Sequence, residues 1–182
     1  MLETRHIRAK VTMVGDKSVG KTSLIRRYVL DEFSDEYLLT LGAKVLKKAV
    51  PLPFPDLGVE LTMELSIWDI MGQTRFREIV KEAYFHGASG VLAVIDLTRW
   101  DTLPGIADWV DAVTEVSGPV PVLLAVNKKD LASQARFGAN DIAEVAQQIG
   151  CEWLMTSART GENVEEAFRK LATAIASRHL HV

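Results

Sequence analysis

One loop constrains the fold of this chain more than any other feature. Its sequence, GDKSVGKT at 15–22, matches the pattern G-x-x-x-x-G-K-[ST]. The loop follows an apolar segment at 7–15, which is typical of a strand, and precedes a helix-like segment at 21–30. In that context the glycines let successive backbone N–H groups face an anion, and the helix adds its positive N-terminus. The loop therefore predicts a phosphate site.

The rest of the chain alternates strand-like and helix-like segments. The runs at 91–98 and 120–128 are nearly continuous in apolar residues, as expected for parallel strands covered on both faces, and a short strand is expected at 152–156. Apolar residues at helical spacing predict three helices, through Ile106, Trp109, Val110 and Val113, then Ile142, Val145, Ala146 and Ile149, then Val164, Phe168, Leu171 and Ile175. This alternation predicts an α/β fold with these stripes in the core.

One region breaks the alternation. The segments 44–50 and 59–68 both resemble strands, with no helix between them. Their link, PLPFPDLG, has prolines at 51, 53 and 55, and proline cannot donate to a sheet ladder. We therefore expect a hairpin joined by an extended loop. The basic cluster TRHIRAK at 4–10 is expected to flank the first strand.

Length and composition bound the function. The 182 residues fit one domain, 1–182, and 48% apolar with 25% charged residues is a globular balance. A net charge of −3 gives no support to nucleic-acid binding. Cys151 is the one cysteine, which excludes an intrachain disulfide. No stretch is long and apolar enough for a signal peptide or a membrane span, Leu2 excludes N-myristoylation, and SRHLHV has no prenylation cysteine. We expect a cytoplasmic protein without a direct lipid anchor.

The phosphate loop carries the first candidate residues. The Lys21 ammonium can reach the β- and γ-phosphates of a nucleotide, and the Thr22 hydroxyl can ligate Mg²⁺. The expected nucleotide-binding residues of this segment are Gly15, Asp16, Lys17, Ser18, Val19, Gly20, Lys21, Thr22 and Ser23. The loop predicts a triphosphate ligand but does not specify the base, because kinases, ATPases and GTPases all use it.

A second motif specifies the base. NKKD at 127–130 follows an apolar strand, at the end where open α/β sheets bind ligands. The Asp130 carboxylate can accept two hydrogen bonds from guanine, whereas adenine would leave it unpaired. TSART at 156–160 ends the next strand, where small residues allow a backbone N–H to approach the guanine oxygen. Asn127 can tie this loop to the phosphate loop, and the expected nucleotide-binding residues of these two segments are Asn127, Lys128, Asp130, Leu131, Ser157, Ala158 and Arg159.

Taken in order, residues 15–22, 69–73, 127–130 and 157–158 resemble the motifs of the Ras superfamily of small GTPases. The Rab branch is the most similar, through WDIMGQTRFR and TSARTGENVEEAF. The resemblance covers essentially the whole chain. It implies a P-loop NTPase fold: a six-stranded, mostly parallel sheet with one antiparallel hairpin strand and helices on both faces. It also implies GTP or GDP with Mg²⁺ as the ligand.

The resemblance also assigns residues in two switch segments. In switch I, at 31–42, Phe33 would pack on the guanine, Tyr37 would close over the phosphates and Thr40 would ligate Mg²⁺. Near the end of the second hairpin strand, Asp69 would meet Mg²⁺ through water. Gly72 would offer its N–H to the γ-phosphate, and Gln73 would position the attacking water. Gln73 and Lys21 are thus the candidate catalytic residues, and Thr22, Thr40 and Asp69 the candidate metal ligands.

Three features depart from the family pattern. Lys17 stands where a small residue is usual; it can neutralise the γ-phosphate, obstruct an incoming arginine or point into solvent. DIMG replaces the common D-T-A-G, so Ile70 is expected to pack inward and Met71 to turn away, with an altered switch as a consequence. The prenylated tail is missing. Four explanations fit that absence: recruitment to a membrane through a partner, a role outside membrane traffic, a shortened chain, or a prokaryotic origin.

The leading hypothesis is a GTP-hydrolysing switch. No arginine occurs between residues 28 and 74, and Arg75 and Arg77 are expected to face solvent or a partner. We therefore expect slow intrinsic hydrolysis, of order 10⁻⁴ to 10⁻³ s⁻¹, accelerated by an activating protein. Exchange proteins are expected partners too, and effectors should read the surfaces at 34–48 and 70–85. A GTP-binding scaffold with negligible hydrolysis is the alternative, and an adenine-using kinase or ATPase the third possibility.

Overall fold

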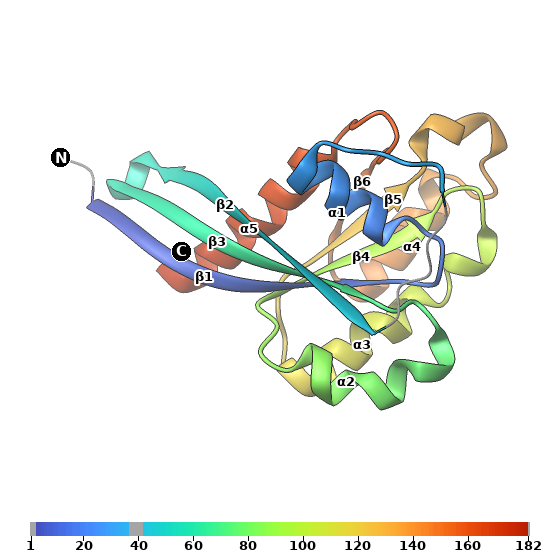
Figure 1. The fold of residues 1–182 in the computed structure, drawn as a ribbon, viewed down its shortest axis with the longest axis horizontal. Helices are drawn as coiled ribbons and strands as arrows, with labels where there is room; N and C mark the ends of the chain where they lie inside the picture. The colour runs from blue at the N-terminus through green and yellow to red at the C-terminus, as the bar shows by residue number, and fades with distance from the viewer. Residues whose placement is uncertain (1–2, 37–41, 182) are drawn as a thin grey trace.

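A computed structural model describes residues 3–36 and 42–181, which form a six-stranded sheet with helices on both faces (Figure 1). The strands are β1 (Glu3–Val14), β2 (Ala43–Phe54), β3 (Val59–Ile70), β4 (Gly90–Asp96), β5 (Val122–Asn127) and β6 (Glu152–Met155). The helices are α1 (Lys21–Leu30), α2 (Arg77–Phe85), α3 (Ile106–Ser117), α4 (Ala139–Ile149) and α5 (Val164–Leu180). Short 3-10 turns are η1 (Pro55–Leu57), η2 (Thr74–Phe76), η3 (Trp100–Thr102) and η4 (Lys129–Gln134).

The strand order positions the phosphate loop at the centre of the sheet. The order is β2-β3-β1-β4-β5-β6, in which only β2 runs antiparallel to its neighbour. β1 lies between β3 and β4, so the chain leaves β1 where the strand order reverses, the usual ligand site of such sheets. The predicted α/β sheet with one antiparallel hairpin strand is confirmed.

Two apolar cores fix the sheet between its helices. One core contains buried residues of α1 and α5, including Tyr28 stacked on Phe168 at 4.1 Å between ring centroids. The other contains buried residues of α2, α3 and α4, with Trp109 and Phe85 among its largest side chains. The predicted helical stripes lie in these cores, and α1 spans the predicted residues. No helix in the described part of the chain is long and apolar enough to cross a membrane.

The prediction of an extended proline-rich loop between the hairpin strands was wrong. β2 continues through Pro51 and Pro53, which pair in register with Thr62 and Glu60 of β3. β2 is an edge strand, and both prolines alternate with the buried Val50 and Leu52. Alternate residues of an edge strand have N–H groups that face solvent, so a missing N–H costs no ladder hydrogen bond there. The connection is only the η1 turn and the residue after it.

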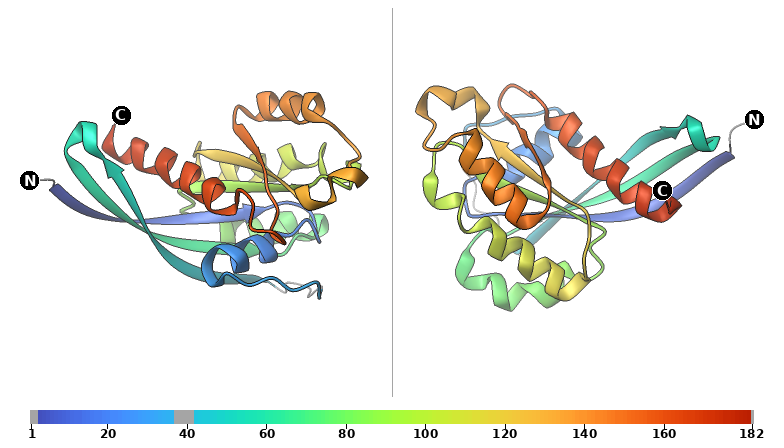
Figure 2. Two further views of the ribbon diagram at one scale, coloured as in Figure 1. Left: turned by 90° about the horizontal axis from the view of Figure 1, so that it is seen from above. Right: turned by 180° about the vertical axis from the view of Figure 1, so that it is seen from behind.

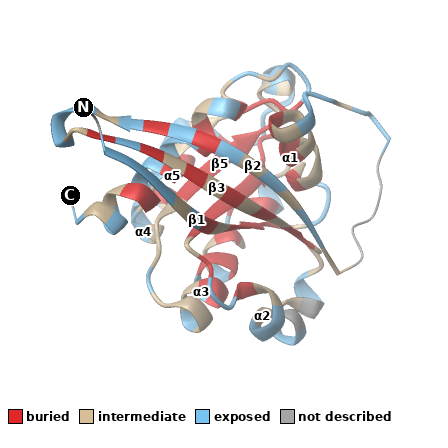
Figure 3. Cartoon of the chain, turned by 60° about the vertical axis from the view of Figure 1, so that its left-hand side comes forward, coloured by how far each residue is buried: buried red, intermediate tan, exposed pale blue. Residues whose placement is uncertain are grey.

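The first strand begins earlier than predicted, because the basic cluster lies inside it. Residues from Glu3 onward pair with β3, with Arg8 opposite Glu64. The long strands β1, β2 and β3 project beyond the rest of the sheet, and α5 runs along one face of them (Figure 2). Their other face is largely solvent-exposed (Figure 3), and the first four residues of β1, at 3–6, are all exposed. This part of the strand therefore lacks the alternation of apolar and polar residues that would have indicated it in the sequence.

Candidate nucleotide-binding site

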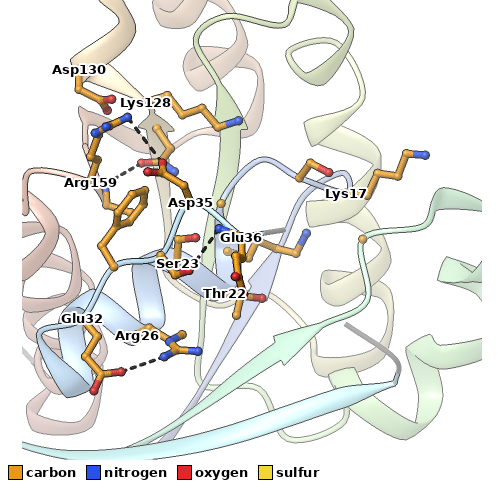
Figure 4. Close-up of a pocket in the computed structure, with 18 of the residues that line it drawn as sticks. Lys17, Thr22, Ser23, Arg26, Glu32, Asp35, Glu36, Lys128, Asp130 and Arg159 are labelled. Carbon is orange, nitrogen blue, oxygen red and sulfur yellow. Dashed lines mark hydrogen bonds and ion pairs between the residues drawn. The ribbon is translucent and has the colours of Figure 1, made fainter. Parts of the chain in front are cut away.

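A cavity of about 610 Å³ lies at the carboxyl ends of the strands, a volume typical of small-molecule sites. Five segments of the chain, from Lys17 to Arg159, line it (Figure 4). Most of the predicted binding residues are among its walls: Lys17, Ser18, Gly20, Lys21, Thr22, Ser23, Phe33, Gly72, Asn127, Lys128, Asp130, Leu131, Ala158 and Arg159. The fold therefore brings the predicted phosphate loop and the predicted nucleotide-binding residues at 127–131 and 158–159 to one place.

The remaining predicted residues lie behind this wall or outside the described chain. Gly15, Asp16, Val19 and Ser157 support lining residues rather than facing the cavity themselves. Asp69 contacts the lining residue Thr22. Tyr37 and Thr40 lie outside the described residues.

The phosphate loop is held by close backbone packing. A Cβ at Gly20, whose φ is +103°, would lie 2.2 Å from Asn127 Nδ2, so this position requires glycine. Helix α1 begins at the next residue, Lys21, so its N-terminal end lies at the cavity lined by the loop. Together these features form an anion cradle.

The buried environment of Lys21 favours an anionic ligand. Its side chain is buried, and Nζ donates to the carbonyls of Gly15 and Asp16, each at 2.8 Å. Burial lowers the pKa of Lys21 to about 8, while the carboxylates of Asp69 and Asp16 oppose that shift. The ammonium thus stays mainly protonated at neutral pH. A nucleotide phosphate would add an anionic partner for a desolvated cation.

Thr22 and Asp69 form the oxygen donor set expected for Mg²⁺. The Thr22 hydroxyl donates to Asp69 Oδ2, and Asp69 is 3% exposed at the end of β3. Mg²⁺ prefers one or two protein oxygen ligands together with phosphates and waters. A hydroxyl and a buried carboxylate beside the phosphate loop fit that preference.

Asn127 joins three loops at the base-reading end of the cavity. Its Nδ2 donates to the carbonyl of Val19, at 3.0 Å, in the phosphate loop. Its Oδ1 accepts from the Thr156 hydroxyl, at 3.2 Å, and from the backbone N–H of Ala158, at 3.3 Å. Asn127 is 2% exposed, so these bonds are shielded from water. These bonds therefore link the loops on both sides of the cavity.

Asp130 is available for a base. Its Oδ1 accepts a hydrogen bond from the Ser157 hydroxyl at 2.7 Å, which fixes the carboxylate while its residue stays exposed. Lys128, two positions earlier, has a left-handed backbone with φ 69°, which turns the chain between Asn127 and Asp130. The carboxylate can thus present acceptors to the ring N–H and exocyclic amine of guanine.

Sequence reasoning missed Asp96, which holds Lys128. Asp96 Oδ2 lies 2.7 Å from Lys128 Nζ, and Asp96 is completely buried at the end of β4. Its Oδ1 accepts from the Thr98 N–H and hydroxyl, at 2.9 and 2.7 Å. The sequence did carry a signal for Asp96, because it lies at the carboxyl end of an apolar strand. The same criterion located NKKD.

Arg27 was also missed. This α1 residue donates through Nε to the Ala158 carbonyl, at 2.8 Å, and through Nη2 to the Arg159 carbonyl, at 2.6 Å. Its Nη1 reaches Asp31 Oδ1 at 3.1 Å. One guanidinium therefore fixes the loop at 157–159 and the start of switch I. No sequence signal distinguished it, because arginine is common on helix surfaces.

Phe33 and Arg159 lie at the rim of the cavity. Phe33 is partly buried against the first core, and the Arg159 guanidinium lies 6.0 Å from its ring centroid. Arg159 Nη1 is also 3.6 Å from Asp35 Oδ1 (Figure 4). The described part of switch I is thus linked to the loop at 157–159.

The departures from the family pattern are accommodated. Lys17 is exposed, and its side chain points away from Thr22 (Figure 4). Ile70 is 1% exposed, as expected, and Met71 packs against the second core while its N–H donates to the Gly42 carbonyl at 3.0 Å. Neither Ile70 nor Met71 removes a polar group from the site.

The turn that follows β3 lies against the phosphate loop. A Cβ at Gly72 would lie 2.5 Å from Lys21 Nζ and 2.7 Å from Lys17 N, so only glycine allows this approach. Gln73 is next; it is not among the cavity-lining residues, and its Oε1 accepts from Arg75 Nε at 3.3 Å. Arg77 does not face solvent as expected, because its guanidinium lies over the Trp109 ring, 5.4 Å from the centroid.

Comparison with known proteins agrees with this geometry. The family model described as Ras family matches residues 10–177. The chain is 35% identical over 179 residues to Ras-related protein Rab-4B from Rattus norvegicus, Homo sapiens and Mus musculus, an alignment that covers 98% of this chain and 81% of each relative. Ras and Rab proteins are switches with slow intrinsic hydrolysis, and they work with effectors, activators and exchange proteins. This chain therefore belongs to the Ras family, as a Rab-like small GTPase that binds GTP or GDP with Mg²⁺ and hydrolyses GTP, and the scaffold alternative is not favoured.

Proposed function

We propose that the cavity binds guanine nucleotide with its triphosphate along 15–23 and its base between 127–131 and 157–159. The Lys21 ammonium contacts the β- and γ-phosphates, and the Asp130 carboxylate accepts from the guanine N–H groups. Phe33 and Arg159 cover the base from the rim, Tyr37 closes over the phosphates, and Gly72 donates its N–H to the γ-phosphate. The observation that carries this assignment is the Asn127 network, which joins both binding segments.

Thr22, Thr40 and Asp69 are the proposed metal-contacting residues. Mg²⁺ would neutralise phosphate charge during hydrolysis. Thr22 contributes its hydroxyl directly, whereas Asp69 acts through a water molecule. The donor chemistry of the Thr22–Asp69 contact supports two of these three assignments.

Gln73 is the proposed water-positioning residue, beside Lys21 as the cation that stabilises phosphate charge. Phosphoryl transfer depends mainly on placement and electrostatic stabilisation, which these two groups supply in part. The remaining stabilisation is the role of an arginine from an activating protein. Lys17 sits at the edge of the cavity, where its charge would act on the γ-phosphate or on that arginine.

The proposed partners act on the switch segments. Effectors read 34–48 and 70–85, and exchange proteins open the site. The exposed Val45 and Ile79, at 43% and 73%, support these surfaces as contact regions. A cytoplasmic location is the simplest setting, and a single cysteine agrees with a reducing compartment.

A nucleotide analysis tests the assignment. The purified chain is denatured and its released nucleotide identified, then GDP is competed with GTP, ATP and xanthosine diphosphate in the presence of Mg²⁺. We expect released GDP or GTP, and ATP weaker than GTP by at least about 10⁴-fold, as for sites built around a specific hydrogen-bond pattern. ATP and GTP binding with equal affinity would overturn the base assignment.

A further inference from the structure

A tryptophan outside the predicted site holds the phosphate loop. Trp109 of α3 is 1% exposed, and its Nε1 donates to Asp16 Oδ1 at 2.9 Å. A buried tryptophan N–H needs a partner, and this partner is 93 residues away in the sequence. The Asp16 carboxylate is thus directed toward α3, while its backbone carbonyl accepts from Lys21.

The same tryptophan contacts the segment that follows Gln73. The Arg77 guanidinium lies over its ring, 5.4 Å from the centroid, and the Arg77 side chain is only 18% exposed. The Thr74 hydroxyl donates to Asp16 Oδ1 at 3.4 Å. The η2 turn is therefore anchored at Thr74 and just after its end, at Arg77, by one pair, Asp16 and Trp109.

We propose that Trp109 is a positioning residue for GTP hydrolysis, which acts through Asp16 on the turn that carries Gln73. This inference rests on the proposed role of Gln73 as the residue that orients the water. Trp109 holds Asp16, Asp16 holds Thr74, and Thr74 is covalently next to Gln73. A displacement of about 1 Å in a reacting group can cost about 100-fold in rate, so a remote contact of this kind is sufficient to affect hydrolysis.

A purely structural role for Trp109 makes a different prediction. A core tryptophan that only fills space would lower stability, nucleotide binding and hydrolysis together when it is replaced. A positioning residue would lower the hydrolysis step and leave GDP release nearly unchanged, because Trp109 is not among the cavity-lining residues. The two roles can thus be separated by measuring both rates.

The experiment compares two conservative variants with matched controls. Trp109→Phe keeps a ring and removes the N–H, and Trp153→Phe makes the same change in the second core at β6. Thr74→Val keeps the side-chain shape and removes the hydroxyl, and Thr114→Val does so within α3, where the hydroxyl bonds the Val110 carbonyl at 3.0 Å. Each full-length chain is loaded with GTP, and single-turnover cleavage and labelled-GDP release are followed with Mg²⁺.

We expect Trp109→Phe and Thr74→Val to slow cleavage by about fivefold or more, with GDP release within about twofold of the unmodified chain. Both controls should cleave GTP at the unmodified rate. Cleavage by Trp109→Phe and Thr74→Val at the control rates would overturn the proposal, and so would a proportional change in cleavage and release. If Trp109→Phe does not fold, the Thr74→Val comparison decides, because Thr74 is exposed and no folding defect is expected.

A double variant tests whether both residues act through Asp16. The cleavage defect of Trp109→Phe combined with Thr74→Val should match the larger single defect, because both changes break one chain of contacts. Defects that multiply would overturn the shared route. An unmodified chain that binds GTP and leaves it intact would overturn the proposed function and this proposal together. Normal cleavage in the variants of an active enzyme would overturn this proposal alone.

Discussion

The two ends of the cavity are built differently. At the base-reading corner, formed by 127–131 and 156–159, Asn127 makes three buried hydrogen bonds, and Thr156 and Ser157 are fully buried. At the hydrolysis turn, formed by 72–77, the side-chain bonds are exposed to solvent, at 3.3 Å from Arg75 to Gln73 and 3.4 Å from Thr74 to Asp16. One end is part of the core, whereas the other rests on a few surface contacts and on Trp109.

This difference indicates a division of labour. Buried, fully paired networks are costly to break, so changes in the base-reading corner should reduce stability and nucleotide affinity together. Weak exposed contacts contribute little to stability, so changes in the hydrolysis turn should alter rate alone. A switch needs this arrangement, because it must hold its nucleotide while part of the molecule responds to the γ-phosphate.

The largest expected effect is in base recognition. Asp130→Asn replaces an acceptor pair with one acceptor and one donor, which opposes a guanine N–H. GDP affinity should fall by about 10⁴-fold, because an unmatched donor remains in the site. Xanthosine diphosphate, which has a carbonyl in place of the guanine amine, should gain affinity. Competition against labelled GDP measures both, and GDP affinity that stays unchanged would contradict the role of Asp130.

The next effect tests the buried network. Asn127→Ala leaves the Val19 carbonyl, the Thr156 hydroxyl and the Ala158 N–H without their partner. The free energy of unfolding should fall by about 3 kcal/mol, and GDP release should accelerate. Asn140→Ala, on the exposed surface of α4, is the control and should change stability by less than about 0.5 kcal/mol. Urea unfolding gives the stability of both variants, and equal losses would contradict the contribution of the buried Asn127 network to stability.

A smaller effect is expected at the missed residue Asp96. Asp96→Asn keeps the side-chain shape and removes the charge that holds Lys128, so Lys128 should cover the base less firmly. We expect GDP release to rise by about tenfold and stability to fall by about 1–2 kcal/mol. Asp101→Asn, whose ion pair with Arg99 is exposed, should leave both unchanged within error. A release rate equal to that of the unmodified chain would remove Asp96 from the binding network.

The smallest effect lies far from both ends, at Cys151. Burial raises the pKa of the Cys151 thiol to about 11, above its usual value near 9, so the folded state disfavours the thiolate. This contribution to stability is complete below pH 9 and is lost as the pH rises toward 11. Between pH 8 and 10.5 the unmodified chain should lose about 1 kcal/mol relative to Cys151→Ala, about half of the full linkage value, because the thiol is only partly buried. A constant difference in unfolding free energy across that range would contradict the raised pKa.

Much of the fold and of the candidate site could be predicted from the sequence, because each binding motif has a fixed local context at the end of a predicted strand. The phosphate loop required glycines between a strand and a helix, and NKKD required a strand end, so both were located before the fold was known. Pro51 and Pro53 led to the wrong prediction of a loop. Proline interrupts a strand only where its missing N–H would pair with a neighbour, and the sequence does not show that β2 lies at the edge of the sheet. The basic cluster led to a wrong strand start because residues 3–6 are all exposed, so the beginning of β1 has no alternation of apolar and polar residues.

Other residues could not be predicted from local pattern. Arg27 and Trp109 act through partners 131 and 93 residues away, and only the folded chain brings them together. Trp109 fits the apolar stripe of α3, and nothing else in the sequence indicates that its N–H donates to the phosphate loop. Periodicity identifies the face a residue occupies and gives no information on which polar atom it meets.

The division of labour is tested most directly by Gln73→Leu. Both chains are loaded with GTP, and cleavage is followed in a single turnover with Mg²⁺, beside the release of labelled GDP. We predict cleavage at least about tenfold slower in Gln73→Leu, with GDP release within about twofold of the unmodified chain. Equal cleavage rates in the two chains would contradict the account.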